Sequence, residues 1–327
     1  MSGSRYRAEI DLRNANDSHT LAIGAVPARS KVLDVGVADG SVASVLGRMG
    51  CRVWAIEIDP VAAEAARELC EDVVVGDVET LDLDSFFSER FDVVLLLDVL
   101  EHLKDPSAAL RKIAAVIAPD GWIVVSLPNV THGAVRLQLL EGHWSYTPIG
   151  LLDTTHLRFF DRAGAEALLA EAGFSVFDRA RVVRRIDATE IPIDVAAQHP
   201  EVLSDLASDP DADTYQFVFL AAVAGGPAAA DPPVLPVRIL QDRVVHLEGI
   251  EQQASAHIRM LESHVASLER QLRRFGVGQP DREDWLLREL AELREQSNRR
   301  RRILQEMLNE LQESSQQLTV EITELRP

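Results

Sequence analysis

The sequence has few cysteines, no long apolar run and a polar start. Its two cysteines, Cys51 and Cys70, form no CxxC pair and have no histidine at metal-ligand spacing, so neither a disulfide nor a zinc framework is expected. No stretch reaches the roughly 18 apolar residues of a membrane span. The N-terminal residues MSGSRYRAEIDLRNAND lack the apolar centre of a secretory signal. We therefore expect a cytoplasmic protein without a transmembrane segment.

Basic residues and aromatic residues are also scarce. The chain has 33 basic and 52 acidic residues, a net charge of −19, and a surface this acidic repels phosphate backbones. Nucleic acid is therefore not expected as a partner. The tract Arg299–Arg302 runs against this balance, and we interpret it as a solvated helix face among glutamates. Aromatic residues make up only 5% of the chain, so a local concentration of them is informative.

Apolar strand-like runs alternate with helical segments through the first 225 residues. The helical segments include PSAALRKIAAVI and AGAEALLAEAG. Alternation of this kind predicts βαβ units and an α/β fold with a largely parallel sheet of about seven strands. The strand-like runs are VLDV (32–35), RVWAIEI (52–58), DVVVGD (72–77), FDVVLLLD (91–98), WIVVSL (122–127), FSVFDRARVV (174–183) and TYQFVFLAAVA (214–224).

A different pattern follows a Gly-, Pro- and Ala-rich linker at residues 226–236. Across 237–275, apolar residues recur every seven positions in two series offset by three, and Glu251 is the exception. β-branched residues in one series and leucines in the other favour a parallel two-stranded coiled coil, so a homodimer is predicted. A break at 276–284 precedes a second helix at 285–327, whose repeat is weaker. The two helices form either a hairpin or a broken rod, and the sequence does not choose between them.

The stretch KVLDVGVADGSVASVL predicts a buried strand, a turn with two glycines and a helix. Ligands of open α/β sheets bind beyond the carboxyl ends of the strands, and glycine lets a backbone approach them closely. The spacing Asp34-x-Gly36-x-Ala38-x-Gly40 differs from the GxGxxG loop that cradles a pyrophosphate. Asp34 and Asp39 also bring negative charge to this turn. The loop therefore suits a ligand with cationic groups.

S-adenosyl-L-methionine is such a ligand, because it carries a sulfonium and an ammonium. The first 225 or so residues resemble class I S-adenosylmethionine-dependent methyltransferases, and VLDVGVADG resembles their first motif, usually DxGxGxG. Ala38 departs from that motif, but alanine is small enough to keep the turn. The resemblance implies a Rossmann-like, seven-stranded methyltransferase sheet, with Asp34, Gly36, Ala38 and Gly40 beside the cofactor.

The resemblance also assigns cofactor roles to residues at the ends of the next three strands. Glu57, followed by Ile58, would accept hydrogen bonds from the ribose hydroxyls. Asp77 would bind the adenine amino group, and the backbone of Val78 would contact the ring. Asp98 would face the methionine part. Any one of these acids, taken singly, is better interpreted as a surface carboxylate or a helix cap, but acids at four successive strand ends favour the cofactor.

An insertion at about residues 128–162 gathers aromatic and titratable side chains after the fifth strand. Within it, Trp144 and Tyr146 would give a flat wall for a sugar face or an aromatic ring; alternatively they pack onto the core. We predict this insertion to be a lid that carries the acceptor site.

The segment DTTHLRFF in this insertion resembles methyltransferases of bacterial glycan and secondary-metabolite pathways, where Asp, His and Arg stand near the acceptor. The resemblance makes His156 the leading general base; a structural hydrogen bond that anchors the lid is the alternative. Asp153 would orient His156 or bind a substrate hydroxyl. Arg158 would bind a carboxylate or phosphate, or brace Asp153.

His102, in LEHLKDP, is the second base candidate. The stretch DVLEH also resembles quinone-biosynthesis O-methyltransferases, in which a related acid–acid–His cluster holds a divalent metal. Asp98, Glu101 and His102 are therefore a candidate metal set. We do not expect a metal as the first interpretation, because the EH pair is widespread in this superfamily and usually packs structurally.

Together these resemblances predict an S-adenosylmethionine-dependent methyltransferase that O-methylates a sugar hydroxyl of a glycan or a glycosylated metabolite. A rod joined to a methyltransferase resembles O-antigen chain-terminating methyltransferases in architecture, which implies a membrane-associated biosynthetic partner. Two alternatives stay open. One is O- or N-methylation of a quinone or another small molecule, and the other is an inactive methyltransferase-like scaffold that acts through its coiled coil.

Overall fold

Contacts divide the chain into two units, Met1–Gln241 and Asp242–Pro327. The computed structural model describes residues 10–12, 14, 16–195, 198–232, 265–267, 288, 291–292, 294–295, 298–299 and 302. The described residues of the second unit are helical. The predicted coiled coil, break and second helix otherwise lie outside the described residues, so these three predictions stay predictions.

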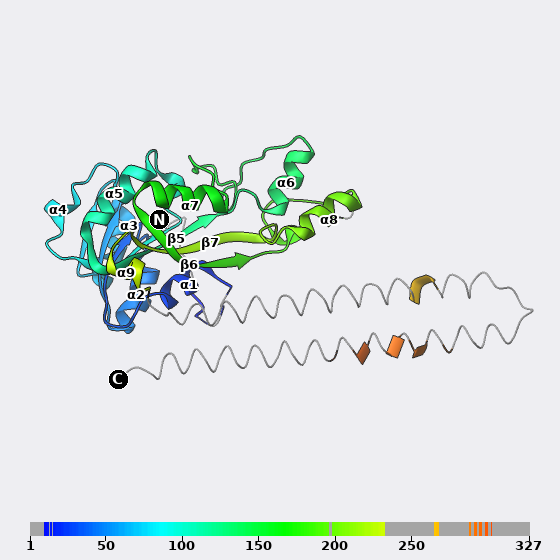
Figure 1. The fold of residues 1–327 in the computed structure, drawn as a ribbon, viewed down its shortest axis with the longest axis horizontal. Helices are drawn as coiled ribbons and strands as arrows, with labels where there is room; N and C mark the ends of the chain where they lie inside the picture. Colours follow the sequence, from blue (N-terminus) through cyan, green and yellow to red (C-terminus); the bar gives the residue numbers. More distant parts are fainter. Residues whose placement is uncertain are drawn as a thin grey trace, which may run out of the picture. The chain divides into compact units, whose positions relative to one another are not determined.

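The first unit is built on one seven-stranded sheet with the order β3-β2-β1-β4-β5-β7-β6. Figure 1 labels three of these strands, β5, β6 and β7. Neighbouring strands from β3 to β5 pair in parallel, whereas β7 is antiparallel to both β5 and β6. The predicted Rossmann-like sheet of about seven, largely parallel strands is confirmed. The strands are β1 (Lys31–Val35), β2 (Arg52–Glu57), β3 (Asp72–Val75), β4 (Phe91–Leu97), β5 (Ile117–Pro128), β6 (Phe174–Val183) and β7 (Thr214–Val223).

Helices cover both faces of the sheet, and the sequence of β4 shows why. Val93 and Leu95 belong to the core on one face and Val94 and Leu96 to the core on the other, and all four are fully buried. A continuous apolar run of this kind is typical of a strand covered on both sides. Helices α1 (Ser18–Gly24), α2 (Ser41–Arg48), α3 (Pro60–Ala66) and α9 (Pro227–Ala230) pack on the first face, and α4 (Leu83–Phe86), α5 (Pro106–Val116) and α7 (Arg162–Glu171) on the second.

Helix α9 changes the predicted end of the domain. Ala228 in α9 is 5% exposed and belongs to the core on one face of the sheet. The first part of the predicted linker at 226–236 is therefore a packed helix, and the domain continues beyond residue 225.

Aspartate residues other than the four predicted cofactor acids begin several helices. Asp59 accepts a hydrogen bond from Val61 N at 2.8 Å and precedes Pro60, the first residue of α3. Asp105 and Asp161 cap α5 and α7 in the same way. These side chains satisfy backbone N–H groups that have no partner inside the helix, so they position helices rather than a ligand.

Two segments outside the sheet pack together into what we call the cap: residues 129–160, which follow β5, and residues 184–213, which join β6 to β7. The segments contain α6 (Gly133–Leu140), η3 (Ile186–Ala188) and α8 (Pro200–Ser208). Leu137 of α6 packs on Leu206 of α8, and Figure 1 shows these helices side by side beyond the ends of β6 and β7. The predicted insertion at 128–162 is thus one half of the cap.

The buried side chain of Asn129 ties the two cap segments together where β5 ends. Its Nδ2 donates to Asp211 O at 3.1 Å and to Thr214 O at 2.8 Å. Its Oδ1 accepts from Thr131 N and from Thr131 Oγ1. Each polar group of this amide is satisfied although Asn129 is fully buried, as burial of a polar group requires.

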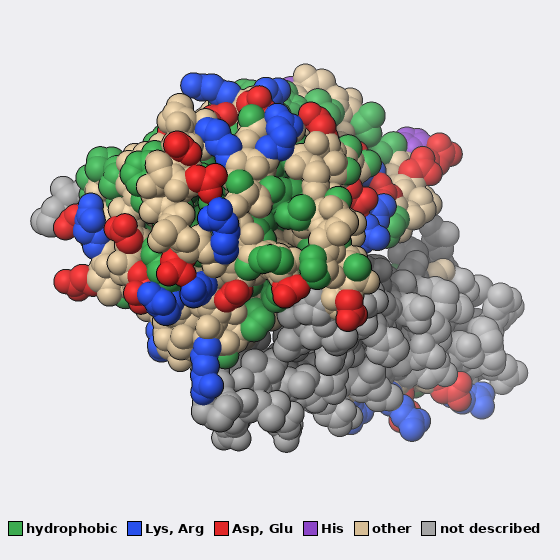
Figure 2. All heavy atoms as spheres, turned by 60° about the vertical axis from the view of Figure 1, so that its left-hand side comes forward, with side chains coloured by type: hydrophobic (Ala, Val, Ile, Leu, Met, Phe, Trp, Pro, Cys, Tyr) green, Lys and Arg blue, Asp and Glu red, His purple; other side chains and the backbone are tan. Residues whose placement is uncertain are grey.

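None of the helices in the described part of the chain has both the length and the apolar character needed to cross a membrane. On the face of the molecule drawn in Figure 2, acidic and basic side chains are interspersed with apolar ones. That face therefore shows no large patch of a single charge.

Candidate active site

The loop after β1 adopts the backbone that its sequence predicts. Gly36, Ala38 and Gly40 all have positive φ, at 80°, 49° and 81°. A Cβ at Gly36 would lie 2.8 Å from Val99 Cγ2, so this position has no room for a side chain. Ala38 occupies the left-handed region at a cost of about 1–2 kcal/mol. The alanine thus keeps the turn that the usual glycine would form.

Glu57 fastens this loop to the end of β2. The residue is 7% exposed. Its Oε2 accepts from Ala38 N and its Oε1 from Asp59 N, both at 2.9 Å. A carboxylate oxygen accepts more than one hydrogen bond, so these bonds leave acceptor capacity for ribose hydroxyls. Ile58, the next residue, is 67% exposed and offers an apolar surface beside that carboxylate.

Asp34, at the end of β1, has an unusual environment. It is 3% exposed, and burial, together with the negative charge of Glu57, raises its pKa to about 7. A positively charged ligand would favour the ionised form of this carboxyl. Burial and the charge of Asp34 in turn raise the pKa of Cys70 to about 12. The thiol of Cys70 is therefore protonated and unreactive at neutral pH.

Asp77 and Val78 follow β3 at the same edge of the sheet. Asp77 Oδ1 accepts from Glu79 N at 2.8 Å, which fixes the carboxylate in the turn. The Val78 side chain is 5% exposed and packs into the core, so its backbone is the part that a ligand would contact, as predicted.

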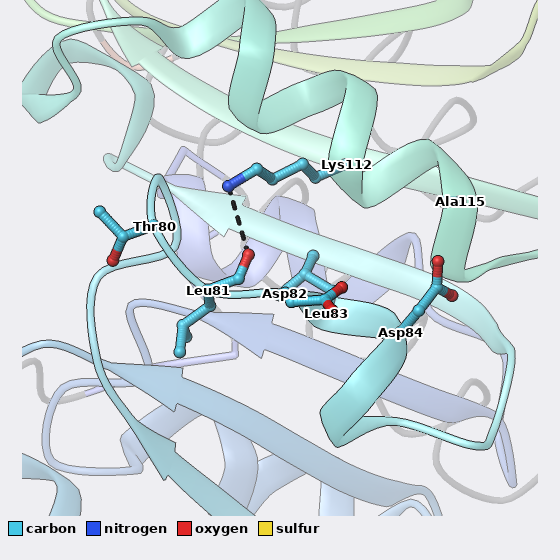
Figure 3. A pocket seen from close by; sticks show the side chains of 7 residues that line it. All are labelled: Thr80, Leu81, Asp82, Leu83, Asp84, Lys112 and Ala115. Carbon is cyan, nitrogen blue, oxygen red and sulfur yellow. Dashed lines mark hydrogen bonds between the residues drawn. The ribbon is translucent and has the colours of Figure 1, made fainter.

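A nearby hollow is not part of this site. It encloses about 340 Å³ between the loop after β3 and α5. In Figure 3, the Lys112 amine points at the carbonyl of Leu81, to which it donates at 3.2 Å. The lining residues are Thr80, Leu81, Asp82, Leu83, Asp84, Lys112 and Ala115. None of the predicted cofactor or acceptor residues is among them.

Asp98, the residue after β4, is held by two side chains that sequence reasoning missed. Ser126 Oγ donates to Asp98 Oδ1 at 2.7 Å. Gln216 Nε2 donates to Oδ1 and Oδ2 at 2.8 and 2.9 Å. Asp98 has φ 55°, a strained value for a residue other than glycine. The two donors therefore hold the carboxylate in an otherwise unfavourable conformation.

Gln216 reaches Asp98 because β7 runs against the other strands. The amino end of an antiparallel strand lies at the edge where its parallel neighbours have their carboxyl ends. Gln216, near the start of β7, pairs in register with Pro128 at the end of β5. A separation of 118 positions between Asp98 and Gln216 hides this relationship in the sequence, and the direction of the last strand would have been the signal for it.

Beyond Asp98, two histidines and a buried glutamate meet where the core touches the cap. Glu101 and His102 lie on η2 (Leu100–His102), and His156 comes from the cap. His156 Nε2 is 3.9 Å from Glu101 Oε1, and the two imidazole rings are 5.0 Å apart between centroids. The structure therefore brings both predicted base candidates together.

Backbone hydrogen bonds join the core to the cap at this point. Leu157 N and Arg158 N donate to Glu101 O at 2.8 and 3.0 Å. His102 Nδ1 lies 3.1 Å from Thr155 O. A carbonyl oxygen only accepts, so Nδ1 carries the proton and the lone pair of neutral His102 is on Nε2. The tautomer of His102 is thus set by the cap.

The electrostatics of the cluster follow from its burial. Glu101 is 1% exposed, and neither of its carboxylate oxygens has a hydrogen-bond partner. Burial, and next the charge of Asp98, raise the pKa of Glu101 well above its usual range. Burial, and next the neighbouring His102, lower the pKa of His156. Both shifts favour the uncharged side chains.

The ligand atoms of Glu101, His102 and His156 lie within 4.8 Å of one another. Two imidazoles and the Glu101 carboxylate, whose oxygens have no hydrogen-bond partner, form a donor set that fits a divalent cation. The predicted metal set named Asp98 in place of His156. In the structure Asp98 is bonded to Ser126 and Gln216, and the third member of the cluster is a cap residue.

Two further predicted residues shape the turn around His156. Asp153 is 2% exposed, and its Oδ1 accepts from Thr155 N and Thr155 Oγ1 at 2.8 and 2.7 Å. Asp153 therefore orders the turn that presents His156. Arg158 Nη2 donates to Lys104 O at 2.5 Å. The predicted brace to Asp153 is replaced by a brace to the chain after η2.

Trp144 and Tyr146, the two residues predicted to form an aromatic wall, lie at the surface of the cap, where they are 39% and 55% exposed. The ring of Trp144 is nearly perpendicular to the rings of Tyr146 and Phe159, with centroids 6.3 and 5.3 Å apart. Phe159 in turn lies 6.1 Å from His156. Aromatic rings thus lead from the surface of the cap to the histidine pair. The role of Trp144 and Tyr146 toward an acceptor stays a prediction.

Part of this chain is similar in sequence to named bacterial methyltransferases. Residues of this chain are 31% identical over 159 residues to a ubiquinone biosynthesis O-methyltransferase of Xanthomonas axonopodis pv. citri, over 46% of this chain and 65% of that protein. A protein of the same name from Xanthomonas oryzae pv. oryzae is 32% identical over 121 residues, or 36% of this chain and 51% of that protein. The chain thus spans less than two thirds of the length of these relatives.

Solved structures with a related fold are more distant in sequence. A methyltransferase of Thermotoga maritima, described as a possible histamine N-methyltransferase, is 19% identical with a TM-score of 0.44, over 64% of this chain and 89% of that chain. Magnesium protoporphyrin IX methyltransferase of Synechocystis, with bound S-adenosylhomocysteine, is 16% identical with a TM-score of 0.44, over 67% and 90%.

The family itself is identified by a match over more than half of the chain. Residues 6–178 match the family described as "Methyltransferase domain". This range contains β1 to β5, α7 and the acids at the four strand ends. The chain therefore belongs to the methyltransferase-domain family, and its cofactor is S-adenosyl-L-methionine.

Proposed function

We propose that this protein transfers the methyl group of S-adenosylmethionine to a hydroxyl oxygen, and that the acceptor is a sugar of a glycan or a glycosylated metabolite. The observation that supports O-methylation most directly is the pair of imidazoles, His102 and His156, next to Asp98. A hydroxyl must lose its proton as it attacks, and a neutral imidazole is suited to take it.

The reaction is an in-line displacement. The acceptor oxygen forms a bond to the methyl carbon while the bond from that carbon to sulfur breaks and its electron pair stays on sulfur. The products are a methyl ether, S-adenosylhomocysteine and a proton, which an imidazole accepts. The protein's contribution is alignment and exclusion of water: Asp98 holds the methionine end, and the cap covers the acceptor side.

The aromatic wall supports a sugar as the acceptor. Exposed Trp144 and Tyr146 present flat apolar faces with polar edges, which suit the C–H face and hydroxyls of a pyranose. A phenolic hydroxyl of a quinone precursor is the second candidate, because the Xanthomonas relatives are named as ubiquinone biosynthesis O-methyltransferases.

Labelled S-adenosylmethionine tests the proposal with two sets of acceptors, oligosaccharides and catechols. Label in the oligosaccharides, lost in His156→Gln and kept in His199→Gln, is the expected result. His199 is a matched control because its side chain is 69% exposed and lies outside the cluster. If only the catechols were labelled, the acceptor would be a quinone-like phenol and the proposed sugar acceptor would be rejected.

Calorimetry separates an enzyme from an inactive scaffold. The enzyme is expected to bind S-adenosylhomocysteine with micromolar affinity, because Glu57 and Asp98 are already held in place. Absence of binding would favour the scaffold, in which the C-terminal region alone is active.

We further propose that the predicted coiled coil at 237–275 makes the protein a homodimer and that it engages a membrane-associated biosynthetic partner. Sedimentation equilibrium of the full chain should give a dimer at tens of micromolar. A chain cut after Pro232 should be a monomer that still binds S-adenosylhomocysteine. The cut is placed there because α9 packs on the sheet. A monomeric full chain would contradict the dimer.

A further inference from the structure

We propose that Glu101, His102 and His156 bind one divalent cation, namely zinc, cobalt or manganese, and that this cation links the cap to the core. The three ligand atoms lie within 4.8 Å of one another, so a single ion can reach all of them after small side-chain adjustments. The ligands come from two parts of the protein, since Glu101 and His102 follow β4 and His156 belongs to the cap.

The strongest support is the state of the Glu101 carboxylate. It is 1% exposed, and both of its oxygens lack a hydrogen-bond partner. A buried polar group without a partner is costly, and each one calls for a specific explanation such as an ion. His156 Nε2 lies 3.9 Å from Glu101 Oε1, beyond hydrogen-bond distance. A cation between them would bind both atoms.

The histidines are prepared for the same role. Nδ1 of His102 donates to Thr155 O, so the lone pair lies on Nε2. Metal-binding histidines commonly donate their other ring nitrogen to a carbonyl or carboxylate in this way. In His156, Nε2 is the nitrogen that lies toward Glu101, 3.9 Å from Oε1. Each ring thus has a nitrogen that can ligate.

The donor set also indicates which cation would bind. Two imidazoles and one carboxylate suit zinc, cobalt or manganese, whereas magnesium and calcium prefer sites made of oxygen atoms alone. Three protein ligands leave coordination positions for water or an acceptor hydroxyl. A cation held here would lower the pKa of a hydroxyl bound to it. With both imidazoles ligating the cation, that hydroxyl would lose its proton to water instead of to a histidine. This catalytic part rests on the proposed function, but cation binding does not.

The cation would act on the cap because the hydrogen bonds around it cross the same junction. Leu157 N and Arg158 N donate to Glu101 O, and these amides exchange with solvent only when the cap separates from η2 (Leu100–His102). An ion that bridges Glu101 and His156 adds a further link at this junction. Cation binding should therefore slow exchange at Leu157 and Arg158.

The test uses the full chain, freed of metal by a chelator and then dialysed. We expect Co²⁺ to bind one per chain with visible absorption bands and Zn²⁺ to displace it. Glu101→Gln keeps the size of the side chain and should weaken Co²⁺ binding at least about 100-fold. His143→Gln is the matched control, since this cap histidine is 68% exposed in its side chain. His102→Gln provides a second variant if Glu101→Gln does not fold.

Hydrogen exchange supplies the second readout. Zn²⁺ should slow exchange at Leu157 and Arg158 at least about 10-fold in the wild-type chain and not in His156→Gln. Binding that Glu101→Gln and His102→Gln both leave unchanged would overturn the site, and unchanged exchange would overturn the link to the cap. Cobalt titration requires neither cofactor nor acceptor. A chain that binds Co²⁺ but transfers no methyl group would contradict the proposed function alone.

Discussion

Gln216 donates its side-chain amide to both carboxylate oxygens of Asp98, at 2.8 and 2.9 Å, across the edge of the sheet. Ser126 supplies the third hydrogen bond to this carboxylate. Hydrogen bonds to a charged group contribute about 1.5–3 kcal/mol each. The orientation of the Asp98 carboxylate thus depends on the first residues of the last strand.

The first prediction concerns this pair. Gln216→Met removes the donor with little change in volume, and we expect the dissociation constant of S-adenosylhomocysteine to rise about 10-fold or more. In an Asp98→Asn background the same change should alter affinity less than about 2-fold, because Gln216 acts through Asp98. Calorimetry of the four proteins measures the coupling, and Gln198→Met serves as the control. Equal losses in both backgrounds would contradict a positioning role.

The second prediction concerns pH. Burial and the charge of Glu57 raise the pKa of Asp34 from its usual 3.8 to about 7 in the folded protein. Between about pH 4 and 7, the folded protein without cofactor therefore keeps a proton on Asp34 that the unfolded chain has lost. Its free energy of unfolding should therefore fall as pH rises through that window and level off above it. Asp34→Asn should flatten this part of a denaturant series.

Cofactor affinity should change in the opposite direction. The cationic groups of S-adenosylmethionine favour ionised Asp34, so binding should strengthen about 10-fold between pH 6 and 8 and release a proton. Calorimetry in two buffers of different ionisation enthalpy counts that proton. A pH slope that persists in Asp34→Asn would show that another group is responsible.

The third prediction concerns the loop after β1. Gly36→Ala places a Cβ 2.8 Å from Val99 Cγ2 at φ 80°, and we expect a loss of about 1–2 kcal/mol in stability and of cofactor binding. Ala38→Gly is the matched change, since it restores the usual glycine of the motif where φ is already positive. Thermal unfolding and calorimetry should show it to be neutral or slightly favourable. A harmful Ala38→Gly would mean that the alanine methyl contributes to the site.

The fourth prediction concerns the cap. A Cβ at Gly150 would lie 2.1 Å from Glu190 Oε1, and Glu190 also accepts from Tyr215 Oη at 2.9 Å. Gly150→Ala should therefore displace Glu190, loosen the cap and reduce methyl transfer while S-adenosylhomocysteine binding persists. Gly142→Ala is the control because its φ is similar, at 79°, with nothing within 4 Å of the added Cβ. Equal effects of the two changes on turnover would rule out the Glu190 contact as the cause.

The core of the fold could be predicted from the sequence because its signals are local. The apolar run of β4 indicates burial on both faces, and the acids Asp34 and Glu57 fall where strands end. The glycine loop after β1 could also be predicted, since positive φ requires small residues at fixed spacing. These features depend on residues close together in the chain.

The features that could not be predicted from the sequence depend on pairing between residues far apart in the chain. The direction of β7 brings Gln216 to Asp98, and no periodicity within β7 records it. The second cap segment, residues 184–213, joins two antiparallel strands through far more residues than the two to five of a hairpin loop. That length was an available signal. The proximity of Glu101 and His156 could not be predicted without knowing how the cap folds onto the core.

The placement of β7 also dictates an order of assembly. Strand β6 pairs only with β7, and β7 lies between β5 and β6 although it is made last. On the ribosome, every acid predicted to bind the cofactor emerges long before Thr214–Val223, and β6 must wait for that strand without a neighbour. Pairing of residues so far apart is slow, and an edge left open in the meantime can capture another nascent chain. Completion of the last strand is thus the step at which folding of this protein competes with aggregation.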